Sequence, residues 1–402
     1  MDVAAFSSSD SAQLIRALAP ARVEAIYVHV PFCARKCHYC DFYSVVADKQ
    51  AHVRFVHRLL EEMRALSPHA VGPIRTIYIG GGTPSILAAQ LWSEILVALA
   101  DSFDLPKTVE FTLEANPETI SAELVETLAA GGVNRLSLGA QSFQPRLLRK
   151  LGRAHAPESV GRAVRLARAA GISNLSLDLI FAIPDETLAE WRADLEAALA
   201  LAPEHLSCYA LSYEVGTPLW RVREADRVRA CPEALEAAMY EDAVTRLAAG
   251  GFRHYEISNW ARLQPGGDGD WRCLHNMTYW LNSNWLALGP AAAGHIGGIR
   301  WRNAPDLEQY LSSSGGAPLA EVEELDADSR LGEELMLRLR LVEGVARDWL
   351  AARLDPSRPA TARRWAAIHR HIAAGLLEHT PTHLRLTRRG LLLANEVLVD
   401  LI

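Results

Sequence analysis

Short apolar runs recur along the first half of the chain and alternate with longer segments of helical periodicity. The runs are AIYVHV (25–30), TIYIG (76–80), VEFTLEA (109–115), RLSLGA (135–140), LSLDLI (175–180) and HLSCYAL (205–211). Each run is followed by Gly, Pro, Asn or Ser, and amphipathic segments such as VRFVHRLLEEMRAL lie between them. Repeated strand and helix units of this kind predict parallel strands with helices packed around them.

Six such units fit an incomplete TIM-like barrel, (β/α)6, better than a complete one, because two further clean units are not found. A doubly wound open sheet would give much the same pattern, and periodicity alone does not choose between the two. We therefore expect an α/β fold, with the incomplete barrel as the favoured architecture.

After about Asn303 the pattern changes to helices, then a hairpin, then a helix. The segments are LGEELMLRLRL (331–341), ARRWAAIHRHIAAGLL (362–377), the turn-rich HTPTHLRLTRRG (379–390) and LLLANEVLVDLI (391–402). This order predicts a smaller C-terminal winged-helix-like domain. We expect a flexible leader over residues 1–21, a barrel domain with its closing segment over 22–303, and the C-terminal domain over 304–402.

Composition is that of an ordinary globular protein, with 402 residues, 50% of them hydrophobic and 22% charged. The net charge of -7 gives no electrostatic reason to expect nucleic acid as a partner. No segment predicts a signal peptide or a spanning helix, although peripheral membrane association stays open. Six cysteines without disulfide-like spacing favour a reducing compartment, so we expect a cytoplasmic protein.

The first strand leads directly into three closely spaced cysteines, Cys33, Cys37 and Cys40, in VHVPFCARKCHYCDFYS. We call these three residues the cysteine triad. Three thiolates can ligate three irons of a 4Fe-4S cluster and leave the fourth iron open to another ligand. The alternatives are a zinc site with His38 as fourth ligand, or reduced core cysteines, but zinc usually takes ligand pairs from two separate segments.

The spacing CxxxCxxC and its neighbours resemble the radical S-adenosylmethionine (SAM) superfamily. Within it they resemble the branch shared by oxygen-independent coproporphyrinogen dehydrogenases and HemW-type heme chaperones. This resemblance implies that the amino and carboxylate groups of SAM bind the open iron. It also implies that Tyr27 contacts the methionyl part of SAM, that Tyr39 packs on adenine, and that His29 lies near the cluster. For each of these, the alternative is a side chain that simply fills the barrel interior.

The second strand ends in Gly80, Gly81, Gly82, Thr83 and Pro84. Successive glycines let the backbone approach a ligand closely, although tight turns use them too. The run matches the GGGTP element of the resembled family, in which it receives the SAM amino group.

Four more polar residues stand at or just beyond strand ends: Glu114, Gln141, Arg153 and Asp178. Carboxylates and amides suit ribose hydroxyls, and an arginine suits a carboxylate. The resemblance places these positions around the ribose and carboxylate of SAM. Each could instead be a solvated charge or a helix cap, but Asp178 interrupts an apolar strand, where an isolated carboxylate is costly.

The segment CLHNMTYW (273–280) matches an HNxxYW element of the same branch, and an aromatic surface with His275 could hold heme and ligate its iron. The alternative is a packing segment that closes the barrel. The dehydrogenases carry a further cysteine, CxxxCxxCxC, where this chain has Phe42. Phe42 favours a chaperone that binds heme and transfers it to apoproteins over a radical SAM enzyme acting on a tetrapyrrole. The cofactors expected are a 4Fe-4S cluster, SAM and heme.

Overall fold

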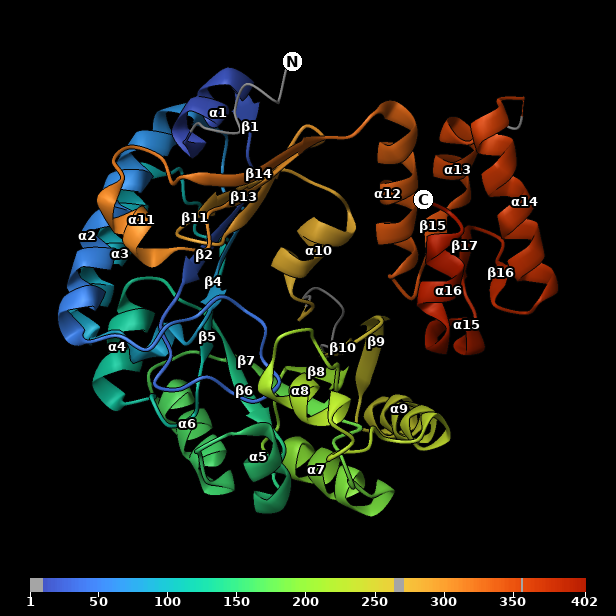
Figure 1. Cartoon of the computed structure of the whole chain (residues 1–402), viewed down its shortest axis with the longest axis horizontal. Coiled ribbons are helices and arrows are strands. Elements are labelled where there is room, and N and C mark those ends of the chain that lie inside the picture. Colours follow the sequence, from blue (N-terminus) through green and yellow to red (C-terminus); the bar gives the residue numbers. More distant parts are fainter. Residues whose placement is uncertain (1–9, 264–270, 356) are drawn as a thin grey trace.

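The computed structural model describes residues 10–263, 271–355 and 357–402, and its centre is one large curved sheet (Figure 1). Twelve strands form this sheet in the order β14-β13-β12-β11-β2-β4-β5-β6-β7-β8-β10-β9. The six in its middle are parallel: β2 (Ala25–Val30), β4 (Thr76–Gly81), β5 (Glu110–Ala115), β6 (Arg135–Gln141), β7 (Asn174–Phe181) and β8 (His205–Ala210). They agree with the six predicted runs to within one residue at either end. Among the described strands, β14 and β9 are opposite edges, so the expected incomplete barrel is confirmed.

Helices cover the outer, convex side of this sheet (Figure 1). They are α2 (Lys49–Leu66), α3 (Ala89–Ser102), α4 (Ala122–Ala130), α5 (Pro145–Leu151), α6 (Pro157–Ala169), α7 (Leu188–Ala200) and α9 (Glu233–Ala249). Helix α8 (Pro218–Glu224) instead contacts the loop of the three cysteines, where the Leu219 N–H donates to the His38 carbonyl at 2.8 Å, and short 3-10 turns η2 (Ser67–His69) and η3 (Pro84–Ile86) follow α2 and β4. Alternate strand residues such as Ile26, Val28 and Leu136 are fully buried in the main hydrophobic core. Because successive strand residues point to opposite faces, the other set points into the barrel.

Short antiparallel strands extend the sheet at both ends. They are β9 (Phe252–Glu256), β10 (Asn259–Arg262), β12 (Ala293–Ile296), β13 (Ile299–Asn303) and β14 (Leu319–Glu324), whereas β11 (Trp285–Leu288) pairs in parallel with β2. Helices α10 (Leu274–Trp280) and α11 (Leu307–Ser312) lie in this part of the chain. The sheet therefore continues past the boundary expected at 303/304. Its last strand, β14, has the sequence LAEVEE and is an edge strand rich in charge, as exposed edges commonly are.

The leader predicted for residues 1–21 is structured over the part that is described. Residues 11–18 form α1 (Ser11–Leu18), and the Asp10 side chain accepts a hydrogen bond from the Gln13 backbone N–H. Leu14 and Ile15 are fully buried in the main core. Strand β1 (Ala21–Arg22) follows and pairs with β3 (Ala70–Val71). Residues 11–18 are therefore an amphipathic helix that buries its apolar side, not part of a flexible leader.

The C-terminal part has its own hydrophobic core and its own three-stranded sheet, β15-β17-β16. Its elements are α12 (Ala327–Leu339), β15 (Val345–Ala346), α13 (Arg347–Arg353), α14 (Pro359–Ala373), β16 (Leu377–His379), β17 (His383–Leu386), α15 (Arg388–Leu392) and α16 (Ala394–Val399). Three helices and a β-hairpin in this order agree with the predicted winged-helix-like domain. The predicted last helix is divided into α15 and α16. The domain contacts the barrel near β9, where the Val342 N–H donates to the Tyr255 carbonyl.

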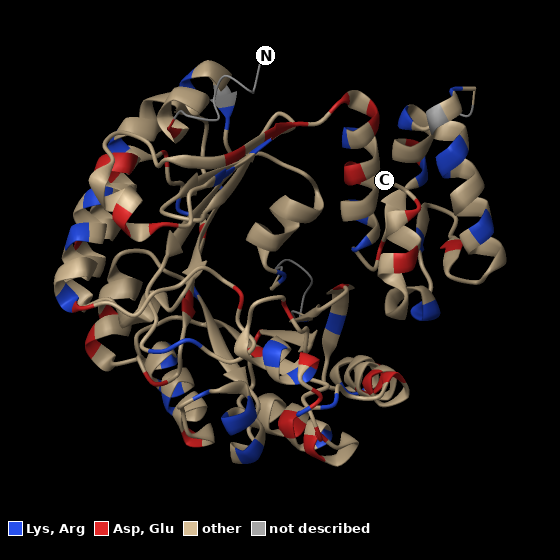
Figure 2. Cartoon of the chain, viewed as in Figure 1, with Lys and Arg blue, Asp and Glu red and all other residues tan. Residues whose placement is uncertain are grey.

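Acidic and basic side chains are interspersed over the outer helices (Figure 2). Several form ion pairs, such as Arg146 with Glu190 at 2.6 Å and Arg192 with Asp242 at 2.9 Å. Within the described parts of the chain, none of the helices has the length and apolar character needed to cross a bilayer.

Candidate functional site

The loop that carries the cysteine triad follows β2 and is held by backbone hydrogen bonds at several points. The Cys33 N–H donates to the Val45 carbonyl at 3.0 Å, and the Thr83 N–H donates to the Phe32 carbonyl at 2.7 Å. A side chain at Gly82 would place its Cβ 2.6 Å from the Phe32 carbonyl oxygen. Glycine is therefore required here because two backbone segments touch, which fixes the triad loop against the end of β4.

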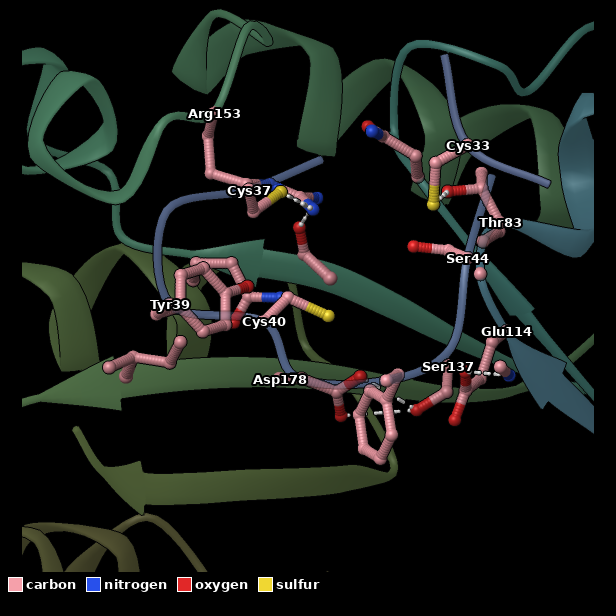
Figure 3. A pocket seen from close by; sticks show the side chains of 18 of the residues that line it. Cys33, Cys37, Tyr39, Cys40, Ser44, Thr83, Glu114, Ser137, Arg153 and Asp178 are labelled. Carbon is pink, nitrogen blue, oxygen red and sulfur yellow. Dashed lines mark hydrogen bonds between the residues drawn. The ribbon is translucent and has the colours of Figure 1, made fainter. Parts of the chain in front are cut away.

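All three thiols of the cysteine triad line one cavity and are free of disulfides (Figure 3). Cys33 Sγ lies 3.5 Å from Thr83 Oγ1, and an Arg153 N–H donates to Cys37 Sγ at 3.7 Å. Burial raises the pKa of the Cys40 thiol to about 11, so this thiol must lose its proton when it becomes a ligand.

The triad fits a polynuclear cluster better than a single metal ion. Among the described residues, no three His, Cys, Asp or Glu side chains are arranged to hold one ion. A cubane cluster needs no such convergence, because each thiolate ligates a different iron. His38, the fourth ligand of the zinc alternative, instead uses its Nδ1 with the Lys150 carbonyl at 3.0 Å and does not line the cavity. The donor set therefore fits a 4Fe-4S cluster held by Cys33, Cys37 and Cys40.

Glu114 and Asp178 enter the cavity from β5 and β7 and are hydrogen-bonded by neutral donors. The Tyr78 hydroxyl donates to Glu114 Oε1 at 2.7 Å, and the Gly81 N–H donates to Glu114 Oε2 at 3.3 Å. The Ser137 hydroxyl contacts both oxygens of Asp178 at 3.0 and 3.1 Å. Burial raises the pKa of Glu114 to about 7 and also raises the pKa of Asp178. Both carboxyls are thus poised to accept hydrogen bonds from ligand hydroxyls when ionised.

Arg153 and Gln141 complete the polar wall beside the triad. Arg153 lies close to Cys37 and donates from Nη2 to the Gly139 carbonyl at 2.7 Å (Figure 3). Gln141 has φ of 63°, at a point where the register between β6 and β7 shifts. This left-handed backbone is uncommon for a residue with a side chain and is often found at functional sites.

Tyr39 lines the cavity and packs against a small apolar cluster formed by α5 and the loops around it. Tyr27 and His29 do not line the cavity; the Tyr27 hydroxyl lies 3.1 Å from His29 Nδ1, and the Tyr27 ring stacks near Tyr78. His29 Nε2 lies 2.8 Å from the Tyr43 carbonyl, and burial lowers the pKa of His29 to about 4. His29 is thus a neutral link between β2 and the end of the triad loop.

The cavity has a volume of about 620 Å³ and extends from the triad into the barrel. Its lower wall holds polar residues that were not identified from the sequence: Tyr78, Arg135, Ser137, His205, Ser207 and Asn276. The sequence pattern of the strands could have identified most of these residues. Arg135 and Ser137 on β6, like His205 and Ser207 on β8, alternate with buried leucines or cysteine, whereas parallel strands covered on both faces are usually apolar throughout.

His275 does not face the cavity as a free ligand. It lies on α10 with 0% exposure, and its two ring nitrogens lie 2.9 Å from Thr76 Oγ1 and 2.8 Å from Tyr279 Oη. Burial lowers the pKa of His275 to about 3. Glu110 accepts hydrogen bonds from the Leu274 and His275 backbone N–H groups at 3.1 Å each. The HNMTYW segment therefore packs across the starts of the strands, which is the packing alternative described above.

Comparison with known proteins agrees with this geometry. Residues 27–198 match the radical SAM superfamily and residues 325–393 match the HemN C-terminal domain. A protein of *Bacillus subtilis* named heme chaperone HemW is 34% identical over 93% of this chain and 98% of its own length. Its namesakes are 36% identical in *Mycobacterium tuberculosis*, over 95% and 96%, and 32% identical in *Escherichia coli*, over 93% and 97%.

Among solved structures, the *Escherichia coli* coproporphyrinogen III oxidase HemN, a radical SAM enzyme, superposes with a TM-score of 0.83. The superposition covers 99% of this chain and 97% of that one at 20% identity, which establishes the shared fold. The chain therefore belongs to the radical SAM superfamily and, within it, to the family of proteins named heme chaperone HemW.

Proposed function

We propose that this protein is a heme chaperone that binds heme, carries a SAM-compatible 4Fe-4S cluster on its cysteine triad, and transfers heme to apoproteins. The observation that carries the proposal is the match to proteins named heme chaperone HemW along nearly the whole chain. The triad would hold the cluster, and Gly81, Gly82, Thr83, Glu114, Gln141, Arg153 and Asp178 would surround SAM. When bound, such a cluster supplies one-electron chemistry or a ligand-exchange site.

Phe42 separates the chaperone from the enzyme that is the alternative. Its side chain is 62% exposed at the rim of the cavity, in the position where the dehydrogenase pattern has its additional cysteine. Phenylalanine offers neither a thiol nor a metal ligand, so a reaction that depends on that sulfur is not supported. The unpaired thiols fit a reducing compartment, and we propose a cytoplasmic location on that ground.

The experiment compares heme transfer with coproporphyrinogen conversion in one anaerobic preparation of the reconstituted protein. Heme binding is followed by absorbance, and transfer is followed by the spectrum of a heme-free globin used as the acceptor. We expect saturable heme binding, transfer to the acceptor, and no conversion of coproporphyrinogen. Conversion at the rate of a true dehydrogenase, together with no saturable heme binding, would establish the enzyme instead.

A further inference from the structure

Arg135 is a buried cation for which the described part of the chain provides no hydrogen-bond acceptor. It starts β6, is 1% exposed, and lines the cavity. Its Nε atom is buried without a hydrogen-bond partner among the described residues. A buried guanidinium normally has several acceptors, because an unpaired buried charge is costly.

The carboxylates nearest to Arg135 are already occupied by other donors. Glu110 accepts from the Leu274 and His275 N–H groups, Asp178 from Ser137 and Ser176, and Glu114 from Tyr78 and Gly81. Burial raises the pKa values of all three carboxyls, that of Glu114 to about 7. Burial lowers the pKa of Arg135, but the nearby Cys273 and Glu110 raise it by more, so the guanidinium stays charged while its Nε donor has no acceptor among the described residues.

His205 lines the cavity together with Arg135 and brings no charge to it. His205 is held by Ser176 Oγ at 2.8 Å and by Tyr255 Oη at 2.9 Å, and burial lowers its pKa well below the usual value, so it is neutral. Thr112 is the register partner of Arg135 on β5, and its buried hydroxyl also lacks a partner. Arg135 Nε and Thr112 Oγ1 are thus two neighbouring buried polar atoms without a partner among the described residues, and of these two residues only Arg135 lines the cavity.

We propose that Arg135 forms a carboxylate-binding subsite at the base of the cavity, remote from the cysteine triad. A guanidinium binds a carboxylate through two parallel N–H···O bonds, which would satisfy the donors that the protein leaves unpaired. β6 spans roughly 20 Å from Arg135 to Gln141 at about 3.3 Å per residue. A ligand whose amino acid group is at the triad does not also reach Arg135, so a second carboxylate, such as a heme propionate, fits better. Where heme is that ligand, this inference rests on the proposed function.

The test compares the reconstituted wild-type protein with Arg135→Gln and Arg135→Lys, using heme, heme dimethyl ester and SAM as probes. The ester has the same macrocycle without free carboxylates. Arg253→Gln, at an exposed position on β9, is the matched control. If a propionate binds Arg135, Arg135→Gln should weaken heme binding roughly 10- to 100-fold and leave ester binding unchanged. Arg135→Lys should recover only part of the loss, since lysine lacks the planar fork.

The two sources of the carboxylate give different results. Loss of heme affinity alone assigns the subsite to a propionate. Loss of SAM affinity alone would show that SAM depends on Arg135 and would overturn a subsite remote from the triad. If the affinities for both ligands are unchanged while the ligand-free variant unfolds at a lower temperature, Arg135 is a structural counter-ion and the proposal is wrong.

Two further outcomes are also decisive. The subsite is overturned if the wild-type protein binds heme and heme dimethyl ester equally and if the Arg135 variants bind SAM as tightly as the wild type. The comparison of heme with its ester uses the wild type, so it holds even if Arg135→Gln folds poorly. A wild-type protein that binds no heme refutes the chaperone function, while the SAM measurements still decide the role of Arg135.

Discussion

Replacing Glu114 by Gln should change the pH dependence of stability, because this carboxyl is buried beside the cavity. Its pKa rises from 4.5 to about 7, chiefly through burial, and the hydrogen bond from Tyr78 opposes that rise. A carboxyl with a raised pKa in the folded state binds its proton more tightly there than in the unfolded chain. Wild-type stability therefore gains a contribution as pH falls from about 7 toward 4.5, and that contribution is absent above pH 7.

The size of the change in stability follows from the difference between the pKa of Glu114 in the folded protein and in the unfolded chain. A difference of about 2.5 between the two pKa values corresponds to roughly 3 kcal/mol as an upper limit. Glu114 also faces the cavity, where water screens part of this cost, so about 1–3 kcal/mol is expected. Glutamine keeps an acceptor for Tyr78 but loses the charged acceptor for the Gly81 N–H, which costs about 1 kcal/mol. Glu114→Gln should thus equal or exceed the wild type in stability at pH 8 by up to about 2 kcal/mol and be less stable at pH 5.

Urea unfolding of the cluster-free protein at pH 5, 6, 7 and 8 measures this difference. Glu118→Gln, at an exposed position on the rim of the same cavity, is the control and should show no such trend. The readout is the variant minus the wild type, because burial also raises the pKa values of Glu62, Glu186 and Glu256 into this range. A difference that stays constant from pH 5 to pH 8 would show that Glu114 is already ionised throughout.

Three further substitutions test the site. Replacing the cysteine triad by alanine should remove the roughly four irons bound after anaerobic reconstitution, measured by iron analysis and visible absorbance, and retained iron would contradict the assignment. Gly82→Ala should lower both iron content and stability, because its Cβ would lie 2.6 Å from a backbone oxygen of Phe32; Gly161→Ala, where the space is open enough, should keep full iron content. His275→Ala should lower stability by about 2–4 kcal/mol, measured by urea unfolding, and leave heme affinity unchanged, whereas loss of heme affinity in a folded variant would make His275 a ligand.

The parallel strands and the triad loop could be predicted because each strand is a continuous apolar run bounded by turn residues. The strands at the edges of the sheet could not be predicted in this way, because they form through pairing with a neighbouring strand rather than through their own apolar sequence. Strand β14 carries three glutamates, and its partners on β13 include Arg300 and Arg302, which pair with Glu323 and Glu321 across the ladder. Such a charged strand is recognised only when its partner is known. Helix α1 was likewise not predicted, because its apolar face is recognised only when the core that it packs against is known.

The polar residues inside the barrel are visible in the sequence as an alternating pattern, but this pattern can be interpreted only when the fold is known. In β6, Leu136 and Leu138 are fully buried in the core, whereas Arg135 and Ser137, which alternate with them, face the cavity. Read alone, RLSLGA resembles a half-exposed antiparallel strand, for which polar alternation is ordinary. Once β6 lies between two parallel neighbours and under a helix layer, neither of its faces is open to bulk solvent. Polar residues on the inner face are then normally matched by each other or by a ligand, and Arg135, whose Nε has no partner among the described residues, is the position at which we propose that a ligand carboxylate binds.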